Sequence, residues 1–230
     1  MIKTLDIIVP VFNEEKTIET VIKKLEETDF CSLEKRLILV DDFSDDSTRE
    51  ILSKIKNHKV IFHDKNQGKG AAVATGIKNA TADVVVIQDA DLEYNPCDYS
   101  KLLKLIVDDE ADVVYGSRLK EKSQEKSFLF LSLFANKFLT ALTNILYGSK
   151  ITDMETCYKA FKREKIKDFK IRAKKFDFEP EITAKVIKNK LRLKEVAISY
   201  NARAYSEGKK VKAKDALQAI FTLFYYRFFD

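Results

Sequence analysis

The stretch VVVIQDADLE, residues 84–93, decides the fold of this chain. Its first four residues are apolar and β-branched, which is typical of a strand buried on both faces of a parallel sheet. Two carboxylates, Asp89 and Asp91, lie just past that strand, after Gln88. In open parallel sheets, ligands bind beyond the carboxyl ends of the strands. The stretch therefore predicts a buried parallel strand and a candidate site at its end.

Short apolar runs alternate with helical patterns on both sides of this stretch. The expected strands are residues 6–11, 37–40, 60–62, 84–87 and 112–115, and the expected helices are 16–26, 47–56, 70–78 and 99–107. In the first helix, Ile18, Val21, Ile22 and Leu25 recur at helical spacing. This alternation predicts βαβ units, and therefore an α/β fold with a mostly parallel central sheet covered by helices on both faces.

The pattern changes at about Lys120. The elements expected there are a long apolar helix at 128–146, a strand at 158–161, a helix at 181–188, a strand at 193–199 and an aromatic-rich helix at 214–228. The sequence shows no linker, internal repeat or low-complexity segment between the two parts. We therefore interpret residues 1–230 as one domain, with residues 1–119 as its first half and 120–230 as a C-terminal elaboration.

The composition narrows the class of protein. The chain is 45% hydrophobic and 33% charged, which is typical of a folded globular protein and argues against disorder. A net charge of +5 is too small to indicate nucleic acid, so no nucleic-acid partner is expected. Three widely spaced cysteines give neither a zinc motif nor a disulfide framework, and no signal-peptide pattern follows Met1. We expect a cytoplasmic protein.

Two segments are apolar enough to raise the question of a membrane. Residues 128–146 are interrupted by Asn136, Lys137 and Asn144, which makes a bilayer span costly. A helix that is apolar around most of its circumference is buried in protein or lies at a membrane surface. With the aromatic residues of 216–229, it predicts a peripheral membrane contact on the inner face. Core packing and a dimer contact are equal alternatives.

Polar residues gather where four successive expected strands end. They are Pro10 to Glu15 after the first strand, Asp41, Asp42 and Ser44 to Ser47 after the second, Asn66 to Gly70 after the third, and Gln88 to Glu93 after the fourth. An acid that ends a buried strand, such as Asp41, is costly unless it binds something. A base or a ribose hydroxyl is the expected partner.

Asp89 and Asp91 are two residues apart, so both can reach one hard cation. Carboxylate oxygens suit Mg²⁺ or Mn²⁺, and such ions are usually shared with substrate phosphates. Glu93 is a further candidate ligand, directly or through water. The alternatives are a solvated acidic turn and a calcium loop, but Tyr94 stands where an EF-hand needs glycine. We favour the Mg²⁺ or Mn²⁺ site because of the other polar strand ends.

The turn Gly68-Lys69-Gly70 precedes an expected helix, so its backbone N–H groups and Lys69 could meet an anion. A simple helix-start turn explains the same residues equally well, because neither P-loop spacing nor a complete dinucleotide motif is present. His58 and His63 flank the third strand and are predicted to be incidental surface residues.

Taken together, these segments resemble the family 2 glycosyltransferases with the GT-A fold, in the polyprenyl-phosphate (dolichyl-phosphate mannose synthase-like) branch. The matching pieces are IVPVFNEE ending at Glu15, LVDDFSDDST at 39–48, NQGKGAAVATG at 66–76, VIQDADLEYNP at 86–96 and VVYGSRL at 113–119. Looser matches are TDMETCYKAF at 152–161 and FDFEPEITAKV at 176–186. The resemblance covers most of the chain.

The resemblance implies a role for particular residues. It places a nucleotide diphosphate sugar donor in the 1–119 half, against Pro10, Phe12, Glu14, Asp41, Asp42, Lys69, Asp89 and Ala90, and implies metal binding by Asp91. It implies that Gly116-Ser117-Arg118 reaches the acceptor phosphate. It also implies that Arg203, in a basic loop with Lys209 and Lys210, closes over the donor as a second phosphate clamp; a solvated surface is an equal interpretation for the lysines.

Two departures from the family pattern concern the turn and the acceptor. Asp46 stands where relatives commonly have glycine, and 153–159 reads DMETCYK where mannose synthases have Asp-x-Thr-Ser-Gly-Phe-Arg. A lipid phosphate acceptor is already anionic and needs little deprotonation. A hydroxyl acceptor would need a base, and Asp153 or Glu155 is then the candidate.

The expected function is therefore inverting transfer of a hexose from a UDP- or GDP-sugar to a polyprenyl phosphate, with the metal and Arg203 stabilising the leaving diphosphate. Transfer to a saccharide hydroxyl is the first alternative. A sugar nucleotidyltransferase, which usually has a glycine-rich loop after the first strand, and a non-catalytic nucleotide-sugar-binding module are the others.

Overall fold

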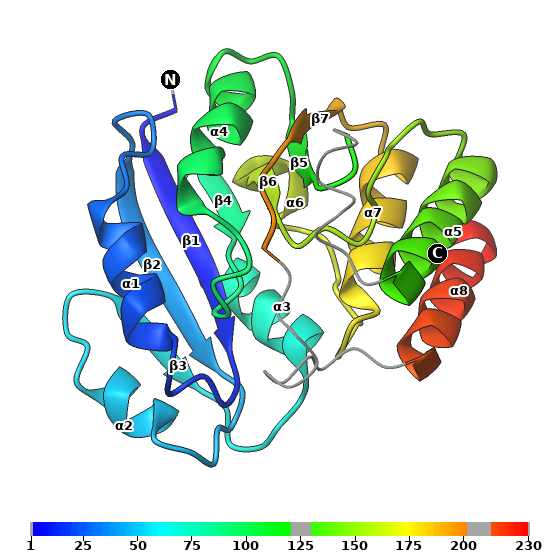
Figure 1. Ribbon diagram of the computed structural model, residues 1–230. Coiled ribbons are helices and arrows are strands. Elements are labelled where there is room, and N and C mark those ends of the chain that lie inside the picture. Colours follow the sequence, from blue (N-terminus) through cyan, green and yellow to red (C-terminus); the bar gives the residue numbers. More distant parts are fainter. Residues whose placement is uncertain (1, 121–129, 202–212, 230) are drawn as a thin grey trace.

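The structure is a computed structural model that describes residues 2–120, 130–201 and 213–229 (Figure 1). The strands are β1 Thr4–Val11, β2 Glu34–Asp41, β3 Lys59–Phe62, β4 Val84–Ile87, β5 Val113–Ser117, β6 Lys159–Lys162 and β7 Leu193–Ala197. The helices are α1 Ile18–Glu27, α2 Thr48–Ser53, α3 Lys69–Asn79, α4 Tyr99–Val107, α5 Phe130–Tyr147, α6 Arg163–Ile166, α7 Phe178–Lys188 and α8 Ala213–Phe228, with a 3₁₀ turn at Pro96–Asp98.

The seven strands form one sheet in the order β3-β2-β1-β4-β6-β5-β7. All neighbours pair in parallel except at β6, which runs antiparallel to both β4 and β5. The predicted α/β fold with a mostly parallel sheet is confirmed. The two parts of the chain share this sheet, because β6 lies between two strands of the first 119 residues.

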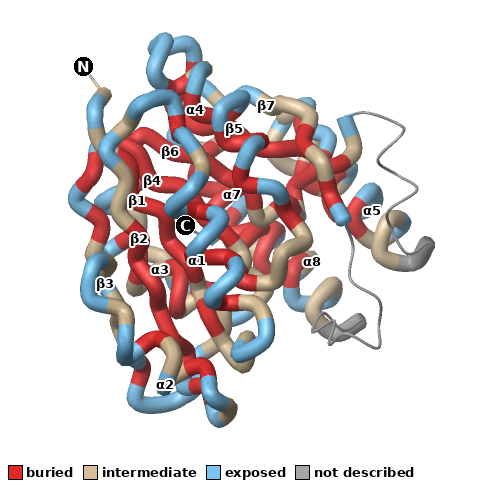
Figure 2. Tube along the Cα trace, turned by 60° about the vertical axis from the view of Figure 1, so that its left-hand side comes forward, coloured by how far each residue is buried: buried red, intermediate tan, exposed pale blue. Residues whose placement is uncertain are grey.

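Helices cover both faces of the sheet, as expected. On one face, α1 and α4 pack against the alternating residues Leu5, Ile7 and Val9 of β1. On the other face, α3 and α7 pack against Ile8 and the strands beside it. The central strands are buried along most of their length, whereas the edge strand β3 is partly exposed (Figure 2). Every apolar residue of β4 is buried, which is why its sequence is continuously hydrophobic.

Helices α5 and α8 form an outer layer at one edge of the molecule, where they lie side by side (Figure 1). They are joined by a small core that contains Leu139, Ala219 and Leu223, together with Met154 from the loop between α5 and β6. Within the described residues, none of the helices combines the length and apolar character that a bilayer crossing requires.

The differences from the predicted elements concern boundaries and short segments. Helix α7 begins three residues before the predicted 181–188, because the apolar Phe178 packs into the core as part of its first turn. Helix α2 is shorter than the predicted 47–56. The four-residue α6 was not predicted, since one helical turn is too short to show a periodic pattern. Residues 128 and 129 of the long apolar helix lie outside the described residues.

Candidate active site

The loops after β1 and β2 are joined by reciprocal hydrogen bonds at the carboxyl edge of the sheet. The Asn13 amide group donates to the Asp45 carboxylate at 2.6 Å and accepts from the Asp45 backbone N–H at 3.0 Å. Glu14 donates its backbone N–H to the Thr48 hydroxyl at 2.9 Å, and its carboxylate accepts from Thr17 at 2.8 Å. The structure therefore brings together these two predicted segments, with Pro10 and Phe12 partly buried beside them.

Asp41, at the end of β2, is fully buried and has a cationic partner. The Arg49 guanidinium donates to its carboxylate at 3.0 Å. That guanidinium also lies over the rings of Phe43 and Phe62, with distances of 5.4 and 5.0 Å to their centroids. A buried acid was expected to have a partner, but Arg49, which is eight residues away on α2, was not predicted from the sequence.

Asp42 fixes the loop that leads into α3. Its carboxylate accepts hydrogen bonds from the backbone N–H groups of Gln67 and Gly68 at 2.9 and 2.6 Å, and contacts His63 Nδ1 at 2.8 Å. The other ring nitrogen of His63 lies 3.0 Å from the Thr75 hydroxyl. The prediction that His63 is an incidental surface residue is wrong, because this side chain is buried between β3 and α3.

The Gly68-Lys69-Gly70 turn packs tightly against residues 173–175. Gly68 has φ of 96°, and a Cβ atom built there would lie 2.2 Å from the Lys174 carbonyl oxygen. The Gly70 and Ala71 backbone N–H groups donate to the carbonyls of Lys175 and Lys174 at 3.1 and 3.2 Å. These amides are therefore already used within the protein, which corrects the expectation that they could meet an anion.

The Lys69 side chain forms an ion pair with Asp89, the acid that follows β4. The two charged groups are 2.6 Å apart, and the Lys69 ammonium also donates to the Cys157 sulfur at 2.8 Å. Burial acts to raise the pKa of Asp89, but the adjacent Lys69 outweighs it, so this pKa lies below its usual value. Burial also raises the pKa of the Cys157 thiol. The site therefore presents an ionised carboxylate beside a cation and a neutral thiol.

The other two predicted metal ligands, Asp91 and Glu93, have hydrogen-bond partners of their own in the turn that follows Asp89. Asp91 accepts the Glu93 backbone N–H at 3.1 Å, and the Glu93 carboxylate accepts the Tyr200 hydroxyl at 2.7 Å. The Ala90 side chain is buried in the core, which leaves only its backbone for a ligand. Within the described residues, no group of three or more His, Cys, Asp or Glu side chains is placed to hold a metal ion.

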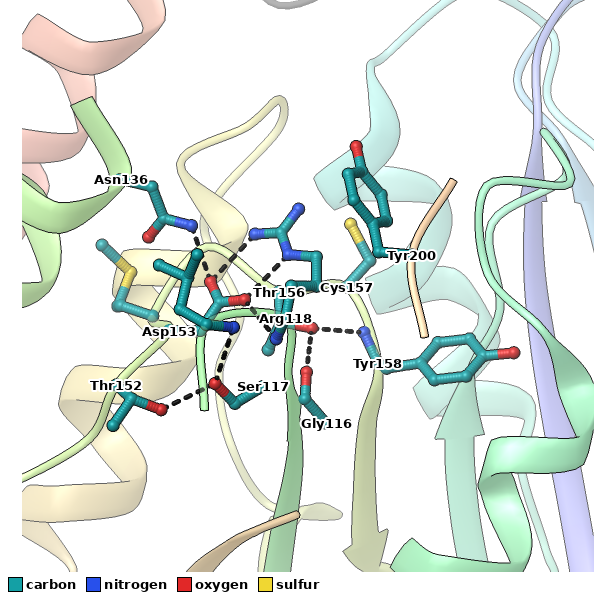
Figure 3. Close-up of polar contacts among 12 residues, drawn as sticks. Gly116, Ser117, Arg118, Asn136, Thr152, Asp153, Thr156, Cys157, Tyr158 and Tyr200 are labelled. Atoms are coloured by element: carbon teal, nitrogen blue, oxygen red, sulfur yellow. Dashed lines mark hydrogen bonds and ion pairs between the residues drawn. The ribbon is translucent and has the colours of Figure 1, made fainter. Parts of the chain in front are cut away.

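Arg118 and Asp153 form a buried bidentate pair beyond the end of β5 (Figure 3). Arg118 donates through Nε and Nη2 at 2.8 and 2.9 Å, and its backbone N–H donates to the same carboxylate at 3.0 Å. Asn136 of α5 adds a fourth hydrogen bond at 2.8 Å. Burial opposes ionisation of Asp153, but Arg118 outweighs it and the pKa of Asp153 is lowered. Such a carboxylate is a poor general base.

Glu155 lies in a different environment. Its Oε1 atom is buried and has no hydrogen-bond partner among the described residues. Burial, and then the nearby Glu179 carboxylate, raise the pKa of Glu155 to about 7. The fully buried Lys159 shapes this segment, because its ammonium contacts the Met154 and Thr156 carbonyls and Glu179. Of the two predicted bases, only Glu155 has a pKa suited to proton transfer near neutral pH.

The segment 153–157 connects the two parts of the site. Asp153 contacts Arg118 at one end, and Cys157 contacts Lys69 at the other. The ring of Tyr94 stacks on Tyr158, with centroids 4.5 Å apart, and the Arg118 guanidinium lies 5.1 Å from the Tyr200 ring centroid. The predicted Arg203, with Lys209 and Lys210, lies outside the described residues.

Several residues that organise this site were not predicted. They are Arg49, Asn136, Cys157, Lys159, Glu179 and Tyr200. A weak signal was present in the sequence: Asn136 interrupts an apolar helix, and Lys159 stands between Tyr158 and Ala160 within the looser motif at 152–161. A polar side chain inside an apolar pattern usually has a specific hydrogen-bond partner.

The amino-acid sequence matches a known protein family. Residues 6–169 match the sequence profile of glycosyl transferase family 2. The chain belongs to glycosyl transferase family 2. It is therefore a glycosyltransferase, and the sequence resemblance to this family is confirmed.

Two proteins with similar sequences act on polyprenyl phosphates, as their names state. The UDP-N-acetylglucosamine–dolichyl-phosphate N-acetylglucosaminyltransferase of Methanococcus voltae is 32% identical over 225 residues, which cover 89% of this chain and 88% of that protein. The dodecaprenyl-phosphate galacturonate synthase of Rhizobium johnstonii is 27% identical and covers 89% of this chain and 61% of that protein. Polyprenyl-phosphate sugar transferases are thus among its relatives.

A solved structure with the same fold is the glucosyl-3-phosphoglycerate synthase of Mycobacterium tuberculosis, crystallised with Mn²⁺, UDP and phosphoglyceric acid. The superposition has a TM-score of 0.75 at 19% identity and covers 99% of this chain and 80% of that one. This likeness confirms the GT-A fold.

Proposed function

We propose that this family 2 enzyme transfers a hexose from a UDP- or GDP-sugar to a polyprenyl phosphate, with inversion at the anomeric carbon. The observation that carries the proposal is the connection of two cations, the partly buried Lys69 and the buried Arg118, by the segment 153–157. Two phosphate-bearing substrates require two cationic positions held at a fixed separation. The names of the two relatives, which specify dolichyl and dodecaprenyl phosphate, support a lipid phosphate as the acceptor.

In this proposal, residues 1–230 act as one domain. The donor occupies the 1–119 half, against Pro10, Phe12, Glu14, Asp41, Asp42, Lys69, Asp89 and Ala90. The acceptor lies against the 120–230 half and Arg118. Asp153 and Asn136 hold the Arg118 guanidinium in one orientation, so that it can meet the acceptor phosphate without first being ordered.

A divalent ion, Mg²⁺ or Mn²⁺, is part of the proposal. Asp89 and Asp91 fit such an ion, because Asp89 is held ionised and an ion shared with a diphosphate needs only one or two protein carboxylates. The solved neighbour contains Mn²⁺ together with UDP, which supports the same donor chemistry. When bound, the ion supplies positive charge to the leaving diphosphate. Glu93 is a candidate ligand only if it exchanges its Tyr200 hydrogen bond.

The chain's own residues carry the remaining roles. A lipid phosphate is already anionic, so the displacement needs no general base. Lys69 keeps the partly buried Asp89 carboxylate ionised and adds positive charge near the diphosphate. We infer that Arg203 closes on the same diphosphate, as the family resemblance implies.

A second candidate is transfer to a saccharide hydroxyl. One observation favours it: Glu155 lies near the Arg118–Asp153 pair with its Oε1 atom buried, and its pKa is raised to about 7, which suits a general base. The nucleotidyltransferase and binding-module alternatives lose support, because family 2 membership indicates glycosyl transfer.

A lipid acceptor implies work at a membrane surface. We therefore propose a cytoplasmic enzyme that contacts the inner face of the membrane peripherally, with no nucleic-acid partner.

The direct test of the reaction class is to incubate the protein with UDP- and GDP-sugars, Mn²⁺ and polyprenyl phosphate. We expect release of nucleoside diphosphate that depends on the acceptor. Formation of nucleoside triphosphate and sugar 1-phosphate when pyrophosphate is added would indicate a nucleotidyltransferase, and no turnover of any donor would contradict the proposal.

The metal is tested separately with Asp91→Ala. We expect this variant to lose turnover at all Mn²⁺ concentrations, whereas Asp108→Ala, an exposed acid at the end of α4, keeps it. Full activity of Asp91→Ala, or of the wild-type protein in EDTA, would contradict the proposed requirement for a divalent ion.

A further inference from the structure

Two apolar stripes lie on the outer surface of helices α5 and α8. On α5 the stripe is Phe134, Phe138 and Ile145, and on α8 it is Leu217, Phe221, Phe224 and Phe228. Their spacing of three, four and seven residues puts each set on one face of its helix. These side chains are between 41% and 80% exposed.

The stripes are not the core side of these helices. Leu139, Ala219 and Leu223 point the other way and join α5 and α8 to each other. Each helix therefore already has a buried apolar face and presents a second one to the outside. A single exposed Phe is ordinary, but exposed apolar stripes on two helices that pack against each other are typical of an interaction site.

The charges around this surface indicate what covers it. Lys137 on α5 and Arg227 on α8 are exposed, and the two helices together contain one acid, Asp215. Two other cations hold α8 to the rest of the protein rather than bordering the stripe: Arg172 donates to the Tyr225 hydroxyl at 2.9 Å, and Lys188 of α7 donates to the carbonyl of the buried Tyr226 at 2.9 Å.

Apolar stripes on two helices that present exposed cations and contain one acid between them are complementary to anionic lipid headgroups over acyl chains. The same two helices of a second copy would offer these cations only Asp215, so a second copy is the poorer match.

The inner side of α5 reaches the acceptor part of the site. Asn136 lies between Lys137 and the exposed Phe134 in sequence, but its side chain points inward and donates to Asp153 at 2.8 Å (Figure 3). Asp153 in turn holds Arg118. One helix thus has an exposed apolar stripe on one side and a hydrogen bond to the proposed acceptor pair on the other.

We propose that the α5–α8 face docks on the surface of an anionic bilayer, with the two stripes inserted among the outer parts of the acyl chains. The inference rests on the proposed function, because it lets a lipid-linked phosphate pass from that bilayer to Arg118 without leaving the membrane surface. Docking is peripheral: the helices lie along the surface.

The test measures docking without chemistry. The full chain is floated with acceptor-free vesicles of phosphatidylcholine, with and without phosphatidylglycerol. We expect wild-type protein to float with the anionic vesicles and much less with the neutral ones. The double variant Phe221→Ser/Phe224→Ser should reduce partitioning by about tenfold or more, since each ring contributes about the free energy of one buried aromatic side chain. Val107→Ser, which removes an exposed apolar residue from α4, is the matched control and should float like wild type.

Two further measurements make each outcome decisive. Light scattering gives the oligomeric state of the wild type and of the double variant; a dimer that the double variant abolishes, with no vesicle binding by the wild type, would overturn docking in favour of a self-interface. Transfer to a short-chain, water-soluble prenyl phosphate should be unchanged in the double variant. Transfer without vesicle binding would overturn docking and leave the function intact, whereas vesicle binding without transfer would leave docking intact and contradict the function.

Discussion

The Lys69 ammonium lies 2.6 Å from the Asp89 carboxylate, so the acid that ends β4 is neutralised within the protein itself. The pairing spans two strand ends, because Lys69 begins α3 and Asp89 follows β4. Without Lys69, the partly buried Asp89 carboxylate would lose its cationic partner. Removing one member of an ion pair that is largely shielded from water is costly for the charge that remains.

Replacing Lys69 with Met should therefore impair the donor side of the site. We expect kcat/KM for the nucleotide sugar to fall by about tenfold to a few hundredfold, the equivalent of one charge-assisted hydrogen bond. Steady-state kinetics and calorimetric binding of UDP and GDP measure the effect. Lys78→Met, on the exposed side of the same helix, is the control. Equal loss in both variants, or none in Lys69→Met, would argue against a donor role for Lys69.

Arg118→Lys should impair the acceptor side selectively. Lysine keeps the charge but cannot reproduce the two parallel hydrogen bonds to Asp153. We expect kcat/KM for the acceptor to fall by about tenfold to a hundredfold, while donor binding is unchanged.

The chain offers a matched control for that variant. Arg192 makes a similar two-point pair with Asp112 at 3.2 and 2.9 Å, but at the opposite, amino-terminal end of the strands. Arg192→Lys should leave the acceptor kinetics unchanged. If kcat/KM for the acceptor falls equally in both variants, the effect of Arg118→Lys is structural.

Glu155 should make stability depend on pH. Its pKa is raised from 4.5 to about 7 by burial and by Glu179, so between these values the folded protein binds the proton more tightly than the unfolded chain. The contribution to stability is complete below the lower value and is lost as pH rises through the upper one, by an amount on the order of 3 kcal/mol. Glu155→Gln removes the ionisable group. We expect it to raise the melting temperature at pH 8 and to change it little at pH 4. An equal effect at both pH values would show that Glu155 does not titrate in this window.

The same variant separates the two acceptor classes. If the acceptor is a lipid phosphate, Glu155→Gln should retain activity within about tenfold, because no base is required. If the acceptor is a saccharide hydroxyl, loss of the base should reduce kcat by about a hundredfold or more. The pH profile of kcat is the additional readout: only in the second case does the wild-type profile have an ascending limb near neutral pH that the variant lacks.

Local pattern was sufficient to predict the strands and the edge of the sheet at which the candidate residues gather. β4 is buried on both faces and reads as a continuous apolar run, and Asp89 follows it because a strand end is where a buried run must stop. The position of β6 was beyond such reasoning. Its pattern marks a strand, but nothing local specifies that it pairs antiparallel between β4 and β5.

The site was predicted in outline and missed in its connections. Asp41, Lys69, Asp89, Arg118 and Asp153 were named from strand ends and motifs, and the structure places them along one region. Their partners are distant in sequence: Cys157 contacts Lys69 across 88 residues, and Asn136 contacts Asp153 across 17. Because hydrogen bonds between distant segments depend on the tertiary arrangement, residue type and spacing do not predict them.

The measurement closest to the central claim follows the sugar itself. The protein is incubated with a radiolabelled nucleotide sugar, polyprenyl phosphate and Mn²⁺, and the label is partitioned between water and organic solvent. The account predicts that label enters the organic phase as lipid-linked sugar, in a one-to-one ratio with released nucleoside diphosphate, and that Arg118→Lys slows both. Release of nucleoside diphosphate while the label stays in the aqueous phase would contradict it, because the sugar would then have been transferred to water or to a soluble saccharide.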